Sequence, residues 1–325
     1  MRIFILGGKG FIGSSILSEL SKLNDVKIFC STRQSDFIDS SGAIWINIDV
    51  FRDRNSLKEM IDNADVIINC IGEVVDKGLM EEINFGLVKN IVDILSARNS
   101  SNTRLIQISS VGCYGAITRF KNTRYIVDED EVERPVGMYE ETKTKADDYI
   151  RSHLSDVNLS SSYTILRPTN VFGTEMKSNA IRTLALMVKK GRFFYISDKS
   201  AISTYVHAKD VAQSVRLVIE NLSLTRNEIY IISDDCEQNK LIDNMALSLG
   251  VNSPRIVVPF FIVRTAIKTA GKLFQNFPLS ESKVNSLTSK VSFSNVKIKQ
   301  LGFMPRSSIY NKEVMNSILN AWGLK

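Results

Sequence analysis

Short apolar runs alternate with longer amphipathic segments through the first two-thirds of this chain. The short runs are rich in Ile and Val and carry few charges, which is typical of parallel strands covered on both faces. Between them, apolar residues recur every three or four positions, as in residues 80–95, which indicates helices. The alternation predicts an α/β fold with a doubly wound parallel sheet. The predicted strands span residues 2–6, 26–31, 43–47, 66–69, 104–109 and 163–166.

The pattern changes beyond Gly173, where helical periodicity dominates. Helices are predicted at 180–190, 210–220, 239–249, 262–274 and 310–322, with one strand at 228–232. A chain of 325 residues is long enough for about two domains. We expect residues 1–173 to form the sheet domain, with 204–235 returning to it. Residues 174–203 and 236–325 are expected to form a smaller, mainly helical substrate lobe.

The net charge of +6 raises the question of nucleic-acid binding. Through most of the chain the basic residues are interspersed with acidic ones, although the C-terminal third is locally basic. No helix-turn-helix or zinc-finger pattern is visible, so we expect no nucleic-acid partner. The excess of positive charge is better explained by an anionic ligand or by solubility.

Membrane-spanning and metal-binding classes are also disfavoured. The longest apolar run, residues 256–263, is too short to cross a bilayer. The segment 259–274 reads either as an interfacial membrane helix or as a helix packed in the second lobe or at a dimer contact, and we expect the packed helix. Four scattered cysteines and two histidines argue against a disulfide framework and against a metal site. With no secretory leader pattern after Met1, we expect a cytoplasmic protein.

The first predicted strand runs into the loop GGKGFIGSS, whose glycines are Gly7, Gly10 and Gly13. Phe11 and Ile12 open the helix that follows. Glycine lets backbone N–H groups approach a pyrophosphate, and the helix N-terminus favours its charge. The phosphate loop of nucleotide hydrolases is excluded because it would require Gly-Lys-Ser/Thr at the end. The motif therefore predicts a Rossmann-like dinucleotide site.

The end of the second predicted strand bears on which dinucleotide binds. An NAD site uses an acidic residue there for the adenosine ribose, whereas IFCSTRQ contains none. Arg33, helped by Ser31 or Thr32, is placed to bind a 2′-phosphate, which favours NADP over NAD; an exposed loop arginine is the alternative. Asp49 either accepts a bond from adenine or caps the turn that follows it.

The stretch GMYEETKTK places Tyr139 and Lys143 four residues apart, on one face of a helix. Such a segment is commonly a solvated charged surface. Alternatively, the Lys143 ammonium lowers the pKa of the Tyr139 phenol, which is normally near 10, and so prepares it for proton transfer. The spacing alone leaves both interpretations open.

Five motifs in order resemble the extended short-chain dehydrogenases/reductases, and more narrowly their epimerase/dehydratase branch acting on nucleotide sugars. They are GGKGFIG, ISSVGCYG at 108–115, YEETK at 139–143, LRPTNVFG at 166–173 and TYVHAKDVA at 204–212. The resemblance runs from residue 3 to about 305, where LGFMP is similar to the family's C-terminal signature.

This resemblance implies roles for individual residues. Tyr139 would be the general acid/base, and Lys143 would bind the nicotinamide ribose while favouring the phenolate. Ser110 would hydrogen-bond the reacting hydroxyl or carbonyl. Asn170 matches an asparagine that contacts substrate, and Asn84 matches one near the cofactor. In some members the helix bearing Tyr139 pairs across a homodimer.

The chain also departs from the family. Where galactose epimerases carry an arginine for the substrate diphosphate, it has Ser203 and Thr204. Either other groups bind the diphosphate, with Lys177, Arg182 and Lys283 as candidates, or the substrate lacks a diphosphate. Val111 and Gly112 stand where dehydratases have an Asp-Glu pair, which disfavours sugar dehydration.

The resemblance implies an NAD(P)-dependent enzyme that acts on a nucleotide sugar. We expect reduction of a 4-keto sugar in polysaccharide precursor synthesis, because the Arg33 site favours NADPH. The alternatives are a C4 epimerase that retains NAD tightly, a reductase of a non-sugar carbonyl, and a non-catalytic NAD(P)-binding protein. The last class typically lacks the Tyr or the Lys, and both are present here.

Overall fold

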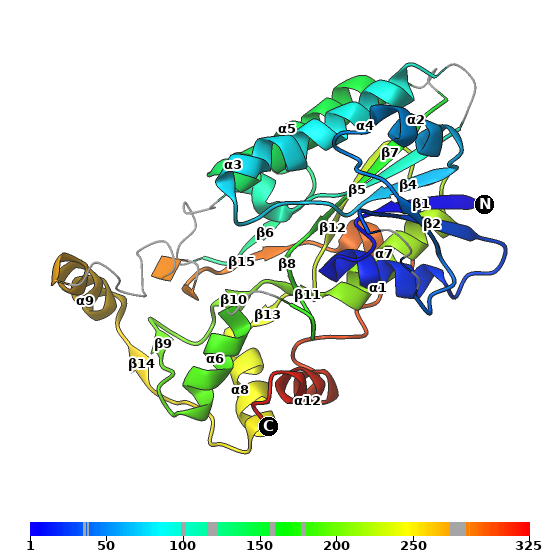
Figure 1. Ribbon diagram of the computed structural model, residues 1–325. Coiled ribbons are helices and arrows are strands. Elements are labelled where there is room, and N and C mark those ends of the chain that lie inside the picture. Colours follow the sequence, from blue (N-terminus) through cyan, green and yellow to red (C-terminus); the bar gives the residue numbers. More distant parts are fainter. Residues whose placement is uncertain are drawn as a thin grey trace.

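The computed structural model describes residues 1–34, 37, 39–98, 102–115, 123–156, 160–176, 180–273, 284–285 and 287–325. Within these residues the centre of the fold is a seven-stranded parallel sheet of order β12-β7-β5-β4-β1-β2-β3 (Figure 1). Its strands are β1 (Arg2–Leu6), β2 (Lys27–Thr32), β3 (Ile44–Asn47), β4 (Val66–Asn69), β5 (Arg104–Ile108), β7 (Ser162–Pro168) and β12 (Glu228–Ile232). The predicted strands and the doubly wound fold class are confirmed.

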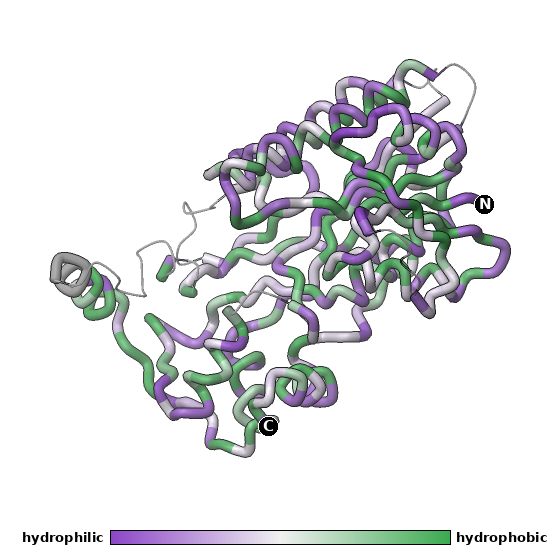
Figure 2. The backbone as a smooth tube through the Cα atoms, in the orientation of Figure 1, coloured by the Kyte–Doolittle hydropathy of each residue, from purple (hydrophilic) through white to green (hydrophobic). Residues whose placement is uncertain are grey.

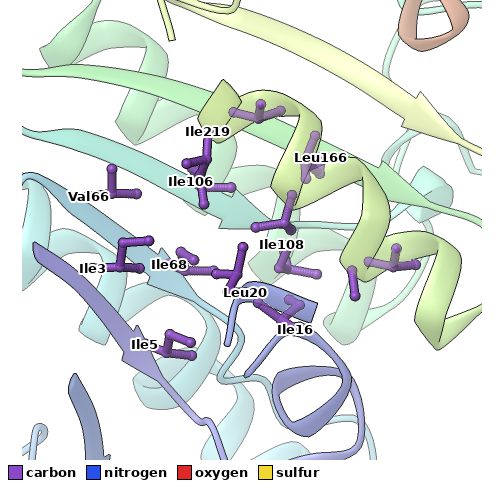
Figure 3. Packing of buried hydrophobic residues seen from close by; sticks show 14 of the residues in the cluster. Ile3, Ile5, Ile16, Leu20, Val66, Ile68, Ile106, Ile108, Leu166 and Ile219 are labelled. Carbon is purple, nitrogen blue, oxygen red and sulfur yellow. The ribbon is translucent and has the colours of Figure 1, made fainter. Parts of the chain in front are cut away.

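Alternate residues of each central strand point to opposite faces of the sheet, as a strand's period of two requires. Ile3 and Ile5 of β1 belong to one buried cluster, whereas Phe4 and Leu6 belong to the other. Figure 3 shows the first cluster, in which Ile16 and Leu20 meet the isoleucines of the sheet. Because both faces are covered, both sets of positions are apolar, which explains the continuous runs in the sequence.

Helices cover both faces of the sheet. The first cluster joins the sheet to α1 (Phe11–Leu20) and α7 (Ala208–Glu220). The second joins it to α2 (Arg54–Asp62), α4 (Leu87–Ser96) and α5 (Met138–Leu154). The helix predicted at 80–95 is built from α3 (Lys77–Met80), a π-helical turn η1 (Glu81–Gly86) and α4.

A smaller group of helices lies beyond the carboxyl ends of the strands (Figure 1). It comprises α6 (Ala180–Lys189), α8 (Gln238–Leu249) and α12 (Lys312–Ala321), which share a third apolar cluster. Next to it are the paired strands β9 (Tyr195–Ile196) and β14 (Val257–Val258), followed by α9 (Phe260–Leu273). The helical periodicity predicted for this half of the chain is confirmed, and the two-lobe division stays a proposal.

One stretch differs from the expected division, which assigned residues 236–325 to the second lobe. Ile298 of α11 (Val296–Lys299) and Phe303 pack in the first cluster, on the sheet. Nearby, β15 (Val291–Phe293) pairs with β6 (Tyr125–Val127). Short apolar segments of this kind carry no periodicity that would assign them to one core rather than another.

Two further short ribbons are present: β8 (Asn170–Phe172) pairs with β11 (Tyr205–His207), and β10 (Ile202–Ser203) pairs with β13 (Cys236–Glu237). Among the residues described, no helix is long and apolar enough to cross a membrane.

Candidate active site

The loop after β1 has the geometry of a pyrophosphate cradle. Gly7 has a φ of +84°, and its carbonyl oxygen accepts the Gly10 N–H at 2.9 Å. A Cβ on Gly13 would lie 2.1 Å from that oxygen, so only glycine fits there. No side chain caps the N-terminus of α1, which directs backbone N–H groups toward the loop. The residues present therefore fit a dinucleotide at this position.

A cavity of about 420 Å³ opens beside this loop, at the carboxyl ends of β1 and β2. Its lining includes Gly7, Lys9, Ser31, Thr32 and Arg33. The cavity thus brings the glycine loop together with the strand end expected to select the dinucleotide. In open α/β sheets, ligands bind in the crevice where the strand order reverses, which here lies between β1 and β4.

Lys9 is a second cation at this cavity that the sequence did not single out. Its Nζ donates to Gln34 Oε1 at 2.5 Å and lies 3.1 Å from the centre of the Phe37 ring. Together with the exposed Arg33, it places two cations at this cavity. Lys9 and Arg33 lie on separate loops, so only the fold shows that both line this cavity.

Asp49 is engaged in a turn. Its carboxylate accepts the backbone N–H of Phe51 at 3.1 Å and lies 3.9 Å from the Arg52 guanidinium. These contacts agree with the interpretation that Asp49 caps the turn after it. A contact between Asp49 and adenine stays a prediction.

The predicted catalytic residues Ser110 and Tyr139 meet at the carboxyl end of β5. Ser110 begins the short helix η2 (Val111–Tyr114), and its Oγ accepts the Gly112 N–H at 3.0 Å. Tyr139 lies in the first turn of α5, and its phenol is close enough to the Ser110 side chain for the two to influence each other. Burial raises the pKa of the Tyr139 phenol, and the interaction with Ser110 opposes that rise.

Lys143 lies one turn further along α5 and is almost fully buried, at 4% exposed. Its Nζ donates to the backbone oxygen of Ile108 at 2.7 Å. Burial lowers the pKa of this ammonium, while the nearby Asp147 carboxylate raises it. The solvated-surface interpretation of this segment is therefore wrong for Lys143.

The expected lowering of the Tyr139 pKa by Lys143 is not what this structure shows. Removal of the phenol from water outweighs the favourable contacts, so the pKa is raised. The Lys143 ammonium is directed to the end of β5, where it donates to a carbonyl rather than to the phenol.

Asn84 connects the loop after β4 to the catalytic helix. Its amide nitrogen donates to the Glu73 carbonyl at 3.0 Å and to Thr142 Oγ1 at 3.1 Å, and its oxygen accepts the Glu73 N–H at 2.8 Å. It lies in the π-helical turn η1, a distortion common at functional sites. Asn84 is thus a positioning residue for α5.

A buried ionic network lies behind the catalytic residues. The Arg167 guanidinium, fully buried, donates to Asp147 Oδ2 at 3.0 and 3.1 Å, to Glu133 at 2.7 Å and to the Tyr114 hydroxyl at 3.0 Å. Asp147 also accepts from Ser109 Oγ at 2.8 Å. This Arg167 network links β7, α5 and the strand end that carries Ser110, and the sequence analysis did not identify it.

Two of the residues expected to contact the substrate, Asn170 and Arg182, lie within the described ranges. Asn170 is exposed, and its amide donates to the Thr204 carbonyl at 2.9 Å, beside the position where galactose epimerases have an arginine. Arg182 donates to the Trp322 carbonyl at 3.3 Å. Lys177 and Lys283 lie outside the described residues. In the described ranges, no cluster of His, Cys, Asp or Glu is arranged to hold a metal ion.

A glycine cradle beside a Ser-Tyr-Lys cluster, at the switch point of a doubly wound sheet, is the site of a dinucleotide-dependent α/β enzyme. Residues 3–233 match the NAD dependent epimerase/dehydratase family, and the chain belongs to that family. It is accordingly an enzyme, and the family is NAD-dependent.

Among curated relatives, one is the N-acetyl-alpha-D-glucosaminyl-diphospho-ditrans,octacis-undecaprenol 4-epimerase of Escherichia coli O157:H7. It is 21% identical over 315 residues, which cover 93% of this chain and 90% of the relative. Another is the sterol-4-alpha-carboxylate 3-dehydrogenase, decarboxylating, of Dictyostelium discoideum, 24% identical over 67% of each chain.

Solved structures share the whole fold. A UDP-glucuronic acid 4-epimerase from Bacillus cereus in complex with NAD superposes with a TM-score of 0.72, at 15% identity and 99% coverage of both chains. A UDP-glucose 4-epimerase from Thermotoga maritima, solved with UDP-glucose, has a TM-score of 0.70 at 17% identity, with 99% coverage of both chains. Identities this low establish the fold alone.

Proposed function

We propose that this enzyme interconverts the C4 epimers of a sugar carried on a diphosphate. The observation that carries the proposal is the cluster of Tyr139, Ser110 and Lys143 beside the glycine cradle. Relatives named as 4-epimerases support this reaction over the net reduction that the sequence favoured. Their carriers are of two kinds, nucleoside diphosphates and a polyprenyl diphosphate.

Different residues of this chain would bind the dinucleotide and move the proton. Gly7, Gly10 and Gly13 would hold the pyrophosphate of the dinucleotide, and Lys143 its nicotinamide ribose. The bound dinucleotide supplies the hydride acceptor and, when oxidised, a positive charge. Tyr139 removes the proton from the C4 hydroxyl as that carbon is oxidised, and returns it after the sugar has turned over. Ser110 hydrogen-bonds the same oxygen in both halves of the reaction.

In this reaction Tyr139 must both accept and donate a proton, so its buried phenol must also be able to lose its own proton. With its pKa raised, the phenol is protonated at neutral pH, ready to donate to a ketone oxygen. Before the oxidative half the phenol must release its own proton, so that the phenolate can accept the proton of the C4 hydroxyl. We infer that the positive charge of the oxidised dinucleotide would favour this phenolate in the complete site, while Lys143 remains bonded to the Ile108 carbonyl one turn away.

NADPH-dependent reduction of a keto sugar is the second candidate, and Lys9 and Arg33 favour it. Two cations at the adenosine end of the cavity match a 2′-phosphate, and the two residues directly after β2, Arg33 and Gln34, include no carboxylate to bind a ribose hydroxyl. The same pair is compatible with an epimerase that uses NADP. Cofactor identity and reaction type are therefore separate questions.

The test is direct. The purified enzyme is incubated with UDP-glucose, UDP-N-acetylglucosamine, UDP-glucuronic acid or a polyprenyl-diphospho-N-acetylglucosamine, without added reductant, and the C4 epimers are quantified by NMR. Interconversion of at least one pair is expected, and Tyr139→Phe should reduce turnover by about 10²-fold or more while leaving the fold intact. Stoichiometric consumption of NADPH with a keto sugar, and no interconversion, would assign the enzyme to the second candidate.

A further inference from the structure

Four large apolar side chains are exposed in a short segment of the second lobe. They are Ile256 at 64%, Val257 at 42%, Phe261 at 69% and Ile262 at 48% exposed, all on β14, the start of α9 or beside them. Figure 1 places this segment at the outer left of the molecule, away from the central sheet, and Figure 2 colours the chain that leads into α9 largely green, for hydrophobic residues. We call these four residues the α9 patch. Large exposed apolar side chains gathered in so short a segment indicate a candidate interaction surface.

The opposite face of α9 accounts for its attachment to the lobe. Val263 is buried with Ile196 and Val284, and Phe260 and Ile267 pack against the same cluster. These helix positions recur at intervals of three and four, so they form one stripe. The sequence led us to expect a packed helix here, and this stripe does pack. Phe261 and Ile262 lie outside it and are not needed to attach the helix.

The charge of this segment is uniformly positive. Between residues 244 and 280 the chain has four basic residues and no acidic one. Arg255 precedes the patch, and Arg264 follows it in α9, where both arginines are exposed. Lys268 and Lys272 continue the positive charge further along the sequence.

We propose that the α9 patch docks on an anionic lipid bilayer, with α9 lying in the plane of the interface. Apolar side chains beside basic ones are what such a surface requires, since burial in the acyl region and attraction to lipid phosphates act together. A second copy of this chain fits less well, because a two-fold contact through the patch would bring together two segments that each have basic residues and no acidic one between residues 244 and 280.

Docking would hold the substrate lobe at the membrane, where a sugar linked to a polyprenyl diphosphate resides. This consequence rests on the proposed function, whereas the docking itself does not. The two can therefore fail separately: vesicle binding is measured without any substrate, and epimerisation of a water-soluble nucleotide sugar needs no membrane.

The test is flotation of the full chain with vesicles of phosphatidylcholine alone or with phosphatidylglycerol added. Binding is expected only with the anionic lipid and should weaken as salt is raised. Phe261→Ser should lower the partition constant about tenfold or more, and Arg255→Gln about fivefold. Leu224→Ser is the matched control, since Leu224 is also 69% exposed but lies in the turn before β12. It should not change binding.

Several results would overturn the proposal. No binding to anionic vesicles would do so, as would equal losses for Phe261→Ser and Leu224→Ser. A dimer seen by sedimentation that Phe261→Ser dissolves, without vesicle binding, would assign the patch to a second copy. Circular dichroism of each variant establishes that it is folded before binding is interpreted.

Discussion

Replacing Arg167 by Met removes the guanidinium at the centre of the buried network behind the catalytic residues. Asp147 then loses two hydrogen bonds of 3.0 and 3.1 Å and keeps the one from Ser109. Both side chains are fully buried, so water cannot replace the lost partner. Leaving a buried carboxylate without its cation costs about 3–5 kcal/mol. That is a large share of the roughly 5–15 kcal/mol that stabilises a typical domain.

The assay is urea unfolding followed by circular dichroism. Arg151→Met is the matched control, because Arg151 binds the same Glu133 at 2.9 Å but is 35% exposed, and it should cost about 1 kcal/mol or less. The double variant Arg167→Met with Asp147→Leu should recover part of the loss, since the buried carboxylate without its cation is removed, although Lys143 then loses the nearby charge of Asp147. A loss below about 1 kcal/mol for Arg167→Met, or strictly additive losses in the double variant, would refute this reasoning.

Two further predictions concern pH and the cofactor. Burial raises the pKa of Asp235 from 3.8 to about 8, so the folded state binds this proton more tightly than the unfolded state. The free energy of unfolding should therefore fall by a few kcal/mol as pH rises from about 4 to about 8. Urea titrations of Asp235→Asn should show a flatter dependence on pH. An unchanged pH dependence in this variant would contradict the prediction. Wild-type protein should bind NADPH about tenfold or more tightly than NADH by calorimetry, and Lys9→Ala with Arg33→Ala should remove that preference. Tighter binding of NADH by the wild type would refute the second prediction.

The parts of the fold that could be predicted are those with a strong local signal. Buried parallel strands such as Val66–Asn69 are apolar on both faces, so their sequence stands apart from every neighbouring segment. The assignment of Ile298 and Phe303 to the sheet core could not be predicted, because it depends on where a long C-terminal segment returns. The π-helical turn at Asn84 could not be predicted either. Asn84 contacts Glu73 and Thr142, which are distant from it in the sequence, and no helical pattern indicates such contacts.

The candidate site divides in the same way. Gly7, Gly13, Ser110 and Tyr139 were identifiable because each occupies a fixed place relative to a strand or helix end. Lys9 gains its significance only from a loop more than twenty residues away, where it meets Gln34. The direction of the Tyr139 pKa also required the structure, because burial is a property of the assembled site and opposes the effect expected from sequence spacing.

In the proposed reaction, hydride leaves and returns to C4 of the sugar while Tyr139 moves only the hydroxyl proton. This proposal is tested by running the interconversion in deuterium oxide and examining the C4 position of both epimers by NMR. Our account predicts that the C4 hydrogen is retained through many turnovers, because a hydride held by the bound dinucleotide does not exchange with solvent. Deuterium at C4 of the product would contradict it, since that result requires removal of the C4 hydrogen as a proton.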